Sequence, residues 1–255
     1  MAGLVAPLLL AAVRDGKLDV VRAEIAAGAD LAQEDEDGQS ALHYAAQQNA
    51  VDAATLLLDA GASVDAVDQD GWTALYAACE QNACDVAKLL IARGATVDRE
   101  DNDRWTPLFS ACQLGQATVV ELLLANGADV KRCDADGWTC SYIACQGGHV
   151  AVLKRLADAG ADVHQKSEKG FTPIYVAASR GHAAVVAFLL DSGAVTTGDW
   201  SPLAAAVEHN HVEVAKLLVA RGADPRDPAA KAAADVARSR GSYDVVAVLE
   251  ATPAG

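Results

Sequence analysis

The chain has 255 residues, of which 52% are hydrophobic and only 5% aromatic, and its formal net charge is −15 at pH 7. A nucleic-acid-binding protein needs a basic surface to displace counterions, so this acidic composition argues against that class. It favours a basic partner instead. No apolar run reaches the roughly 18 residues of a membrane-spanning helix, so no membrane partner is expected.

The first segment opens with the apolar run MAGLVAPLLLAAV. A secretory signal begins with basic residues, which this run lacks, so we interpret it as a first capping helix. The six cysteines form no paired CxxC motifs, which argues against a zinc site, and a chain of this length needs no disulfide staples. These features predict a reducing compartment, which is the cytoplasm or, as the alternative, the nucleus.

Two glycine markers repeat along the chain in step. The first is the glycine of a DG turn, found at Gly38, Gly71, Gly137 and Gly170. The second is the glycine of a GA dipeptide, found at Gly28, Gly61, Gly94, Gly127, Gly160, Gly193 and Gly222. Both follow a spacing of 33 residues as far as residue 170, with Arg104 once in place of the turn glycine. Markers at a fixed period predict a solenoid of stacked units.

One unit, DGWTALYAACEQNACDVAKLLIARGATVD at residues 70–98, is typical of a helix, a turn and a second helix. Thr73 can cap the first helix through its hydroxyl, and Gly94 can end the second in the left-handed conformation. The acidic turn that follows predicts a hairpin-like connection to the next unit. We predict one domain over 1–255, with units at 1–36 (cap), 37–69, 70–102, 103–135, 136–168, 169–198, 199–227 and 228–255 (cap).

This pattern resembles the ankyrin repeat. The segments that carry the resemblance are DNDRWTPLFSACQLGQATVVELLLANGADV at 101–130 and KGFTPIYVAASRGHAAVVAFLLDSGA at 169–194. It covers nearly the whole chain and implies an all-α repeat solenoid of about eight helix-turn-helix units, joined by β-hairpin-like loops. Such a domain is expected to be a non-catalytic protein-interaction module or scaffold, and we expect a monomer.

Three departures from the repeat stand out in chain order. Arg104 replaces a turn glycine, where a positive φ is costly for any residue with a β-carbon. Ser141 stands where the neighbouring units have an apolar residue, and a buried hydroxyl without a partner costs about 1–3 kcal/mol. Between Gly193 and Pro202 the chain is four residues short of the repeat, so the hairpin there is predicted to be truncated or absent.

No catalytic motif, phosphate-binding loop or EF-hand spacing is present, so we expect no enzyme, no cofactor and no metal. His43, His149 and His182 occupy positions where ankyrin repeats commonly carry structural histidines. The HNH triplet at 209–211 lies in a turn between two helices. Three cysteines share one column 33 residues apart and are predicted to be free packing thiols: Cys79, Cys112 and Cys145.

An aromatic column is the strongest functional signal in the sequence. It follows the turn glycine position and comprises Trp72, Trp105, Trp138 and Phe171, with Trp200 in the same slot after the shortened loop. The resemblance places this column at the base of the hairpins, facing the concave groove. Carboxylates precede the first three rings by two residues, at Asp70, Asp103 and Asp136, and others precede the rings by four. Glu80 extends an acidic, ring-lined strip over about residues 35–147.

The leading hypothesis is that this strip binds a basic partner segment, because tryptophan faces attract cations and tryptophan dominates many interfaces. Two alternatives remain open. One is a receptor for a small neutral or cationic ligand stacked between the rings. The other is a structural spacer or targeting subunit, in which the rings only pack on one another.

A narrower hypothesis is a methyl-lysine cage, because some histone-methyltransferase ankyrin domains resemble this arrangement. Trp72, Trp105 and Glu80 would form it. A cage needs about three rings around the cation, so Tyr76 and Phe109 would have to turn outward to complete it. Those two residues occupy the position that is usually histidine in the repeat, which more often points into the structure.

Overall fold

The computed structural model describes residues 8–134, 136–197 and 200–251. Contacts group the chain into two compact parts, an N-terminal unit (Met1–Asp129) and a C-terminal unit (Val130–Gly255). The described residues form sixteen α-helices, and their only β-structure is a set of isolated bridges. The all-α repeat solenoid predicted from the sequence is therefore confirmed, whereas the single domain over 1–255 stays a prediction.

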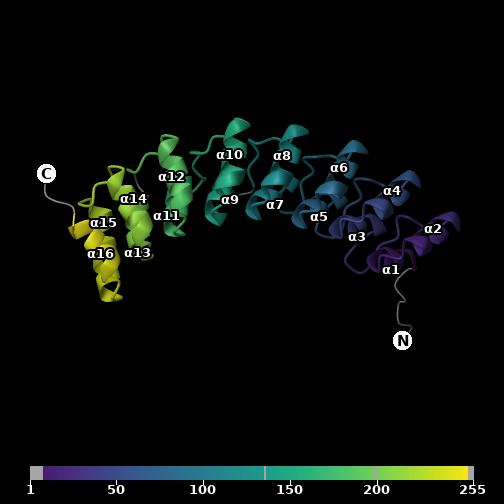
Figure 1. Cartoon of the computed structure of the whole chain (residues 1–255), viewed down its shortest axis with the longest axis horizontal. Helices are drawn as coiled ribbons and strands as arrows, with labels where there is room; N and C mark the ends of the chain where they lie inside the picture. Colours follow the sequence, from purple (N-terminus) through teal and green to yellow (C-terminus); the bar gives the residue numbers. More distant parts are fainter. Residues whose placement is uncertain (1–7, 135, 198–199, 252–255) are drawn as a thin grey trace. The chain divides into compact units, whose positions relative to one another are not determined.

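The N-terminal unit contains four helix pairs arranged in two layers. The first helices of the repeats pack side by side in one layer, and the second helices pack in the other (Figure 1). The first layer is α1 (Leu8–Arg14), α3 (Ala41–Gln47), α5 (Ala74–Glu80) and α7 (Pro107–Gln113). The second layer is α2 (Leu18–Ala26), α4 (Val51–Asp59), α6 (Cys84–Ala92) and α8 (Ala117–Ala125).

The C-terminal unit repeats the same arrangement. Its first layer is α9 (Cys140–Gly147), α11 (Pro173–Ser179), α13 (Pro202–Glu208) and α15 (Pro228–Ser239). Its second layer is α10 (Val150–Asp158), α12 (Ala183–Asp191), α14 (Val212–Ala220) and α16 (Tyr243–Glu250). None of the helices described in either unit is long and apolar enough to cross a bilayer.

The helix ends follow the local signals in the sequence. The hydroxyl of Thr73 accepts a hydrogen bond from the Tyr76 N–H at 3.2 Å, as expected for an N-cap. Thr106, Thr139 and Thr172 cap their helices in the same way. Gly94 follows the last turn of α6 with φ +87°, a left-handed conformation that glycine adopts without a steric penalty. These contacts fix where each helix begins and ends.

Turns between the repeats are hairpin-like but short. In the N-terminal unit single antiparallel bridges join Glu34 to Ser40 and Val67 to Thr73. Arg104 keeps the geometry of the glycine that it replaces, because its φ is +66° and its N–H donates to the Asp101 carbonyl at 3.1 Å. The turn therefore keeps its shape, although Arg104 adopts a strained conformation with a positive φ.

The shortened connection in the C-terminal unit contains residues 198–199, which lie outside the described part of the chain. Its last residue, Trp200, is described and is 40% exposed. Whether a truncated hairpin forms across this connection stays a prediction.

Ser141 is the polar exception in the core of the C-terminal unit. It lies in α9, is 1% exposed, and its hydroxyl has no hydrogen-bond partner among the described residues. The apolar column of first helices is here interrupted by a buried polar atom, as the sequence suggested.

Replacing Ser141 with alanine is expected to raise the free energy of unfolding by about 1–3 kcal/mol, because it removes an unsatisfied hydroxyl from the core. Denaturation in urea measures the change. Ser110→Ala is the matched control on α7, since Ser110 is equally buried but shares a hydrogen bond with Tyr76, and this variant should gain nothing. A Ser141→Ala protein no more stable than the parent would contradict the prediction.

Candidate functional site

Two successive turns in the N-terminal unit are built around carboxylates that bind backbone N–H groups. The Oδ1 atom of Asp68 accepts from the N–H of Asp70 at 3.0 Å and from that of Trp72 at 2.9 Å. One repeat later, Asp101 accepts in the same way from Asp103 and Trp105, at 2.9 and 2.8 Å. The acids four residues ahead of the tryptophans therefore hold the turns in shape.

The same turns are locked to each other. Asn102 donates its backbone N–H to the Asp70 carbonyl at 3.0 Å and its side-chain amide to the Gln69 carbonyl at 2.8 Å. Gly71 makes this approach possible, because a β-carbon there would lie 2.9 Å from the Asn102 side chain and φ is +82°. Trp72 and Trp105 are consequently held in a fixed relation to one another.

Each tryptophan rests on the ring four residues after it. Trp72 stacks on Tyr76 with ring centroids 4.7 Å apart and planes inclined by 29°. Trp105 meets Phe109 at 5.7 Å and 47°. The supporting rings are buried, with Tyr76 5% and Phe109 0% exposed, while both tryptophans remain half-buried. Each tryptophan is thus neither free in solvent nor fully packed, and it leaves part of its surface open.

The two turns and their helices enclose a hollow of about 410 Å³, which we call the acidic pocket. Its lining residues are Asp70, Trp72, Tyr76, Glu80, Asp101, Asn102, Asp103, Trp105, Ser110, Gln113 and Leu114. Six of the residues predicted from the sequence therefore come together here. Phe109 does not line the pocket, because its side chain is fully buried beneath Trp105. It belongs to the support of the site and not to its surface.

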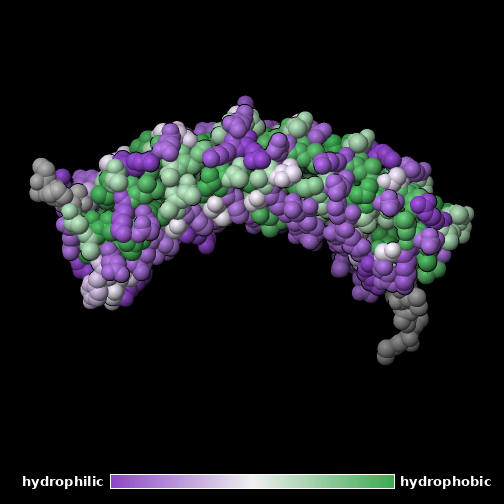
Figure 2. Space-filling view, viewed as in Figure 1, coloured by the Kyte–Doolittle hydropathy of each residue, from purple (hydrophilic) through white to green (hydrophobic). Residues whose placement is uncertain are grey.

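The pocket is negatively charged and contains no basic residue in its lining. Asp70 and Asp103 are exposed, and neither carboxylate has a hydrogen bond or ion pair among the described residues. Burial raises the pKa of Tyr76, and the charges of Asp101 and Glu80 raise it further. In Figure 2 hydrophilic residues gather along the lower edge of this unit, below α3 and α5.

The remaining predicted residues lie in the C-terminal unit. Asp134 binds the N–H groups of Asp136 and Trp138 at 3.0 and 2.8 Å, which repeats the turn of the N-terminal unit. Trp138 stacks on Tyr142 at 5.5 Å, and its indole N–H is buried with no acceptor among the described residues. In the next repeat Ser167 takes the place of the acid and accepts from the Phe171 N–H at 3.2 Å.

Phe171 belongs to a cluster of three rings that sequence reasoning did not identify as a group. It packs on Tyr175 at 5.5 Å and on Trp200 at 4.4 Å between centroids. Because Trp200 packs on Phe171 of the preceding repeat, part of the aromatic column in this unit consists of rings that pack on one another.

Several pocket residues were missed by the sequence analysis, among them Asn102, Ser110 and Leu114. Asn102 carried a signal, because Gln69 occupies the same place one repeat earlier and donates its amide to the Glu36 carbonyl. Ser110 and Leu114 lie on and just after α7, which faces the pocket only once the repeats are stacked.

Histidine side chains join neighbouring repeats through hydrogen bonds to main-chain carbonyls. The backbone N–H of Ser40 donates to Nδ1 of His43, so Nε2 carries the proton and donates to the Trp72 carbonyl at 2.9 Å. His182 reaches the Gln146 carbonyl at 2.9 Å. No cluster of metal-binding side chains occurs in the described residues.

None of the six cysteines, all of which the structure describes, forms a disulfide, and they differ in accessibility. Burial raises the pKa of Cys79 and Cys145, which disfavours the reactive thiolate. We expect the half-buried Cys84 and Cys133 to react with Ellman's reagent in the folded protein, and the four buried thiols to react only on unfolding. Fast modification of all six thiols in the folded protein would contradict this expectation.

Comparison with known proteins supports the repeat assignment. A family model described as ankyrin repeats (3 copies) matches residues 8–101, 96–167 and 142–229. The crystal structure of the human ASB11 ankyrin repeat domain aligns with a TM-score of 0.76 and 30% identity, covering 85% of this chain and 100% of that chain. No curated protein sequence gives a match. Ankyrin repeats are generally protein-interaction modules, and the present chain belongs to the ankyrin-repeat family.

Proposed function

We propose that the acidic pocket binds the side chain of a lysine or arginine in a partner protein. The observation that carries this proposal is the pair of exposed carboxylates without a counter-ion, Asp70 and Asp103, beside the open faces of Trp72 and Trp105. A cation placed over a tryptophan face gains about 0.5–2 kcal/mol, and a nearby carboxylate adds charge attraction.

The rigidity of the site supports a binding role. Hydrogen bonds between the two turns hold both tryptophans before any partner arrives, so little conformational entropy is lost when the pocket is filled. The acids that shape the turns are already engaged with backbone N–H groups, which leaves Asp70, Asp103 and Glu80 to face the partner.

The test is binding of a short fluorescein-labelled peptide of lysine, arginine and glycine, followed by anisotropy, with an acidic peptide of equal length as the negative probe. We expect binding of the basic peptide only, weakening as salt rises. Asp70→Asn with Asp103→Asn should reduce the affinity about two- to thirtyfold. Asp158→Asn with Asp244→Asn, two exposed acids of the C-terminal unit, is the control for net charge. Equal losses in both double variants would refute a localised site.

A methylated lysine is a second candidate, because three rings line the acidic pocket together with Glu80: Trp72, Tyr76 and Trp105. Phe109 is not required for this arrangement. Repeating the titration with a trimethyl-lysine peptide separates the two ligands. Tighter binding of the methylated form favours a cage, and equal affinity leaves charge and stacking as the basis of recognition.

The same titration addresses the other two alternatives. Saturable binding of a small neutral or cationic aromatic compound at Trp72 and Trp105 would favour a ligand receptor, and absence of any peptide binding would favour a spacer or targeting subunit. We place the protein in a reducing compartment, the cytoplasm or the nucleus, on the ground that none of its six cysteines, all within the described residues, forms a disulfide.

A further inference from the structure

The turn between the two helices of a repeat usually carries a side chain that fills the junction with the preceding repeat. Gln116 donates its amide to the Glu80 carbonyl at 2.9 Å. His182 and His211 contact the carbonyls of Gln146 and Ser179 at 2.9 and 3.0 Å. The two histidine rings lie on bare glycines: a β-carbon on Gly148 or Gly181 would lie 2.7 or 2.6 Å from the ring.

The junction between the second and third repeats is filled from the opposite side. The residue there that corresponds to His182 is Ala83, whose side chain is too short to reach the preceding repeat. Asn49 of the preceding turn reaches forward instead, accepting from the Val86 N–H at 3.1 Å and donating to Asp85 at 3.3 Å. Asn49 adopts a φ of +53° in doing so.

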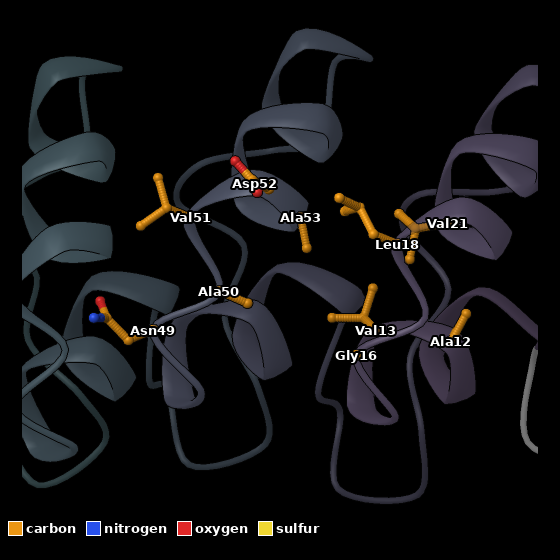
Figure 3. A pocket seen from close by; sticks show the side chains of 10 residues that line it. All are labelled: Ala12, Val13, Gly16, Leu18, Val21, Asn49, Ala50, Val51, Asp52 and Ala53. Atoms are coloured by element: carbon orange, nitrogen blue, oxygen red, sulfur yellow. The ribbon is translucent and has the colours of Figure 1, made fainter.

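The junction between the first and second repeats has neither of these two bridging side chains. Ala50 corresponds here to His182 of a later repeat, and Gly16 corresponds to Gly148. A β-carbon on Gly16 would meet nothing within 4 Å. The result is a hollow of about 400 Å³, which we call the first-junction hollow. Figure 3 shows Asn49 pointing away from it, while Val13, Leu18 and Ala53 face it.

The lining of this hollow indicates what fits. The main-chain carbonyl that would receive a histidine, that of Arg14, already accepts the Gln48 amide at 3.0 Å. Apart from Asn49, whose side chain points away, and Asp52, the lining carries no polar side chain, and Val21 and Val51 belong to it. A ring of carbon atoms therefore suits these walls, because the carbonyl that receives the imidazole N–H at later junctions already accepts a bond here. Asp52 also lines the hollow and has no ion pair among the described residues.

We propose that the first-junction hollow is a second docking site, which receives an aromatic side chain of a partner protein whose neighbouring basic residue pairs with Asp52. The aromatic ring takes the place that a histidine of the chain itself fills at later junctions. The carboxylate of Asp52 selects for a flanking lysine or arginine. This site shares no residue with the acidic pocket, so the proposal does not depend on the function proposed above.

The test uses the whole chain labelled with ¹⁵N and two tripeptides, acetyl-Lys-Phe-Lys-amide and acetyl-Glu-Phe-Glu-amide. We expect saturable amide shifts at Ala50, Val51 and Ala53 with the basic tripeptide, and weaker ones with the acidic tripeptide. Asp52→Asn should lower the affinity for the basic tripeptide about two- to fivefold at this site. Shifts confined to the residues of the acidic pocket would overturn the proposal.

Two variants fill the hollow in the ways that the chain itself uses. Ala50→His restores the missing ring, and Gly16→Asn imitates Asn49, whose side chain tolerates a positive φ. Either variant should abolish the shifts at residues 50–53, and the second keeps the test valid should the first fail to fold. Ala60→His, on an exposed helix end of the same unit, should leave binding unchanged. Undiminished binding to a folded Gly16→Asn or Ala50→His protein would also overturn the proposal.

Discussion

Replacing Trp72 and Trp105 together with alanine is expected to lower the affinity for a basic peptide about a hundredfold or more. Central tryptophans of interfaces each contribute about 2 kcal/mol or more when truncated, and the two side chains line one pocket on interlocked turns. Anisotropy titration of the labelled basic peptide measures the loss. Each single variant should show a smaller effect, because either ring alone still offers one face to the cation.

Trp200→Ala is the matched control for this experiment. Trp200 is 40% exposed, lies in the C-terminal unit and packs on Phe171, so its removal takes away a tryptophan without touching the acidic pocket. Circular dichroism and urea denaturation must show that the double variant remains folded. A folded double variant that binds the peptide as the parent does would leave the tryptophans as packing residues only.

The second large effect concerns stability and separates the two columns of acids. Asp68→Ala is expected to lower the free energy of unfolding by about 1–3 kcal/mol, because the N–H groups of Asp70 and Trp72 lose the acceptor that the buried Asp68 carboxylate provides. Asp70→Ala, two residues away, should change it by less than about 0.5 kcal/mol, since that carboxylate is exposed and without a bond.

Urea denaturation of the two variants gives the comparison directly, and Asp101→Ala with Asp103→Ala repeats it one turn later. Peptide binding should respond to Asp70→Ala even though its stability does not. Equal destabilisation by Asp68→Ala and Asp70→Ala would mean that the turn does not depend on the Asp68 carboxylate.

Much of the fold was predictable because the relevant contacts are local. Thr73 and Tyr76 are three residues apart, so a hydroxyl at the first position caps the helix wherever the repeat is placed. Gly94 ends its helix for the same kind of reason, since only its own φ is involved. Because the pattern recurs every 33 residues, the same local signals predict the helices of each repeat.

Arg104 shows the limit of local reasoning. The sequence suggested that a residue with a β-carbon would disfavour this turn, yet its φ is +66° and the turn keeps its hydrogen bonds. Asp101 accepts from the Asp103 and Trp105 N–H groups on either side, and Asn102 is bonded to the preceding turn. Several bonds together outweigh the strain of one residue.

The sequence by itself determined the repeat, the ends of its helices and the column of rings with its two columns of acids. Only the three-dimensional structure showed which acids are free, because Asp68 and Asp70 are the same residue type and differ in which backbone N–H groups the turn brings within reach. It also decided that Tyr76 reaches the acidic pocket while Phe109 does not, and that Gly16 and Ala50 leave a hollow at the first junction. The pocket and the hollow depend on side chains about one repeat apart, whose distances are set by the stacking of helices and not by the spacing of residues along the chain.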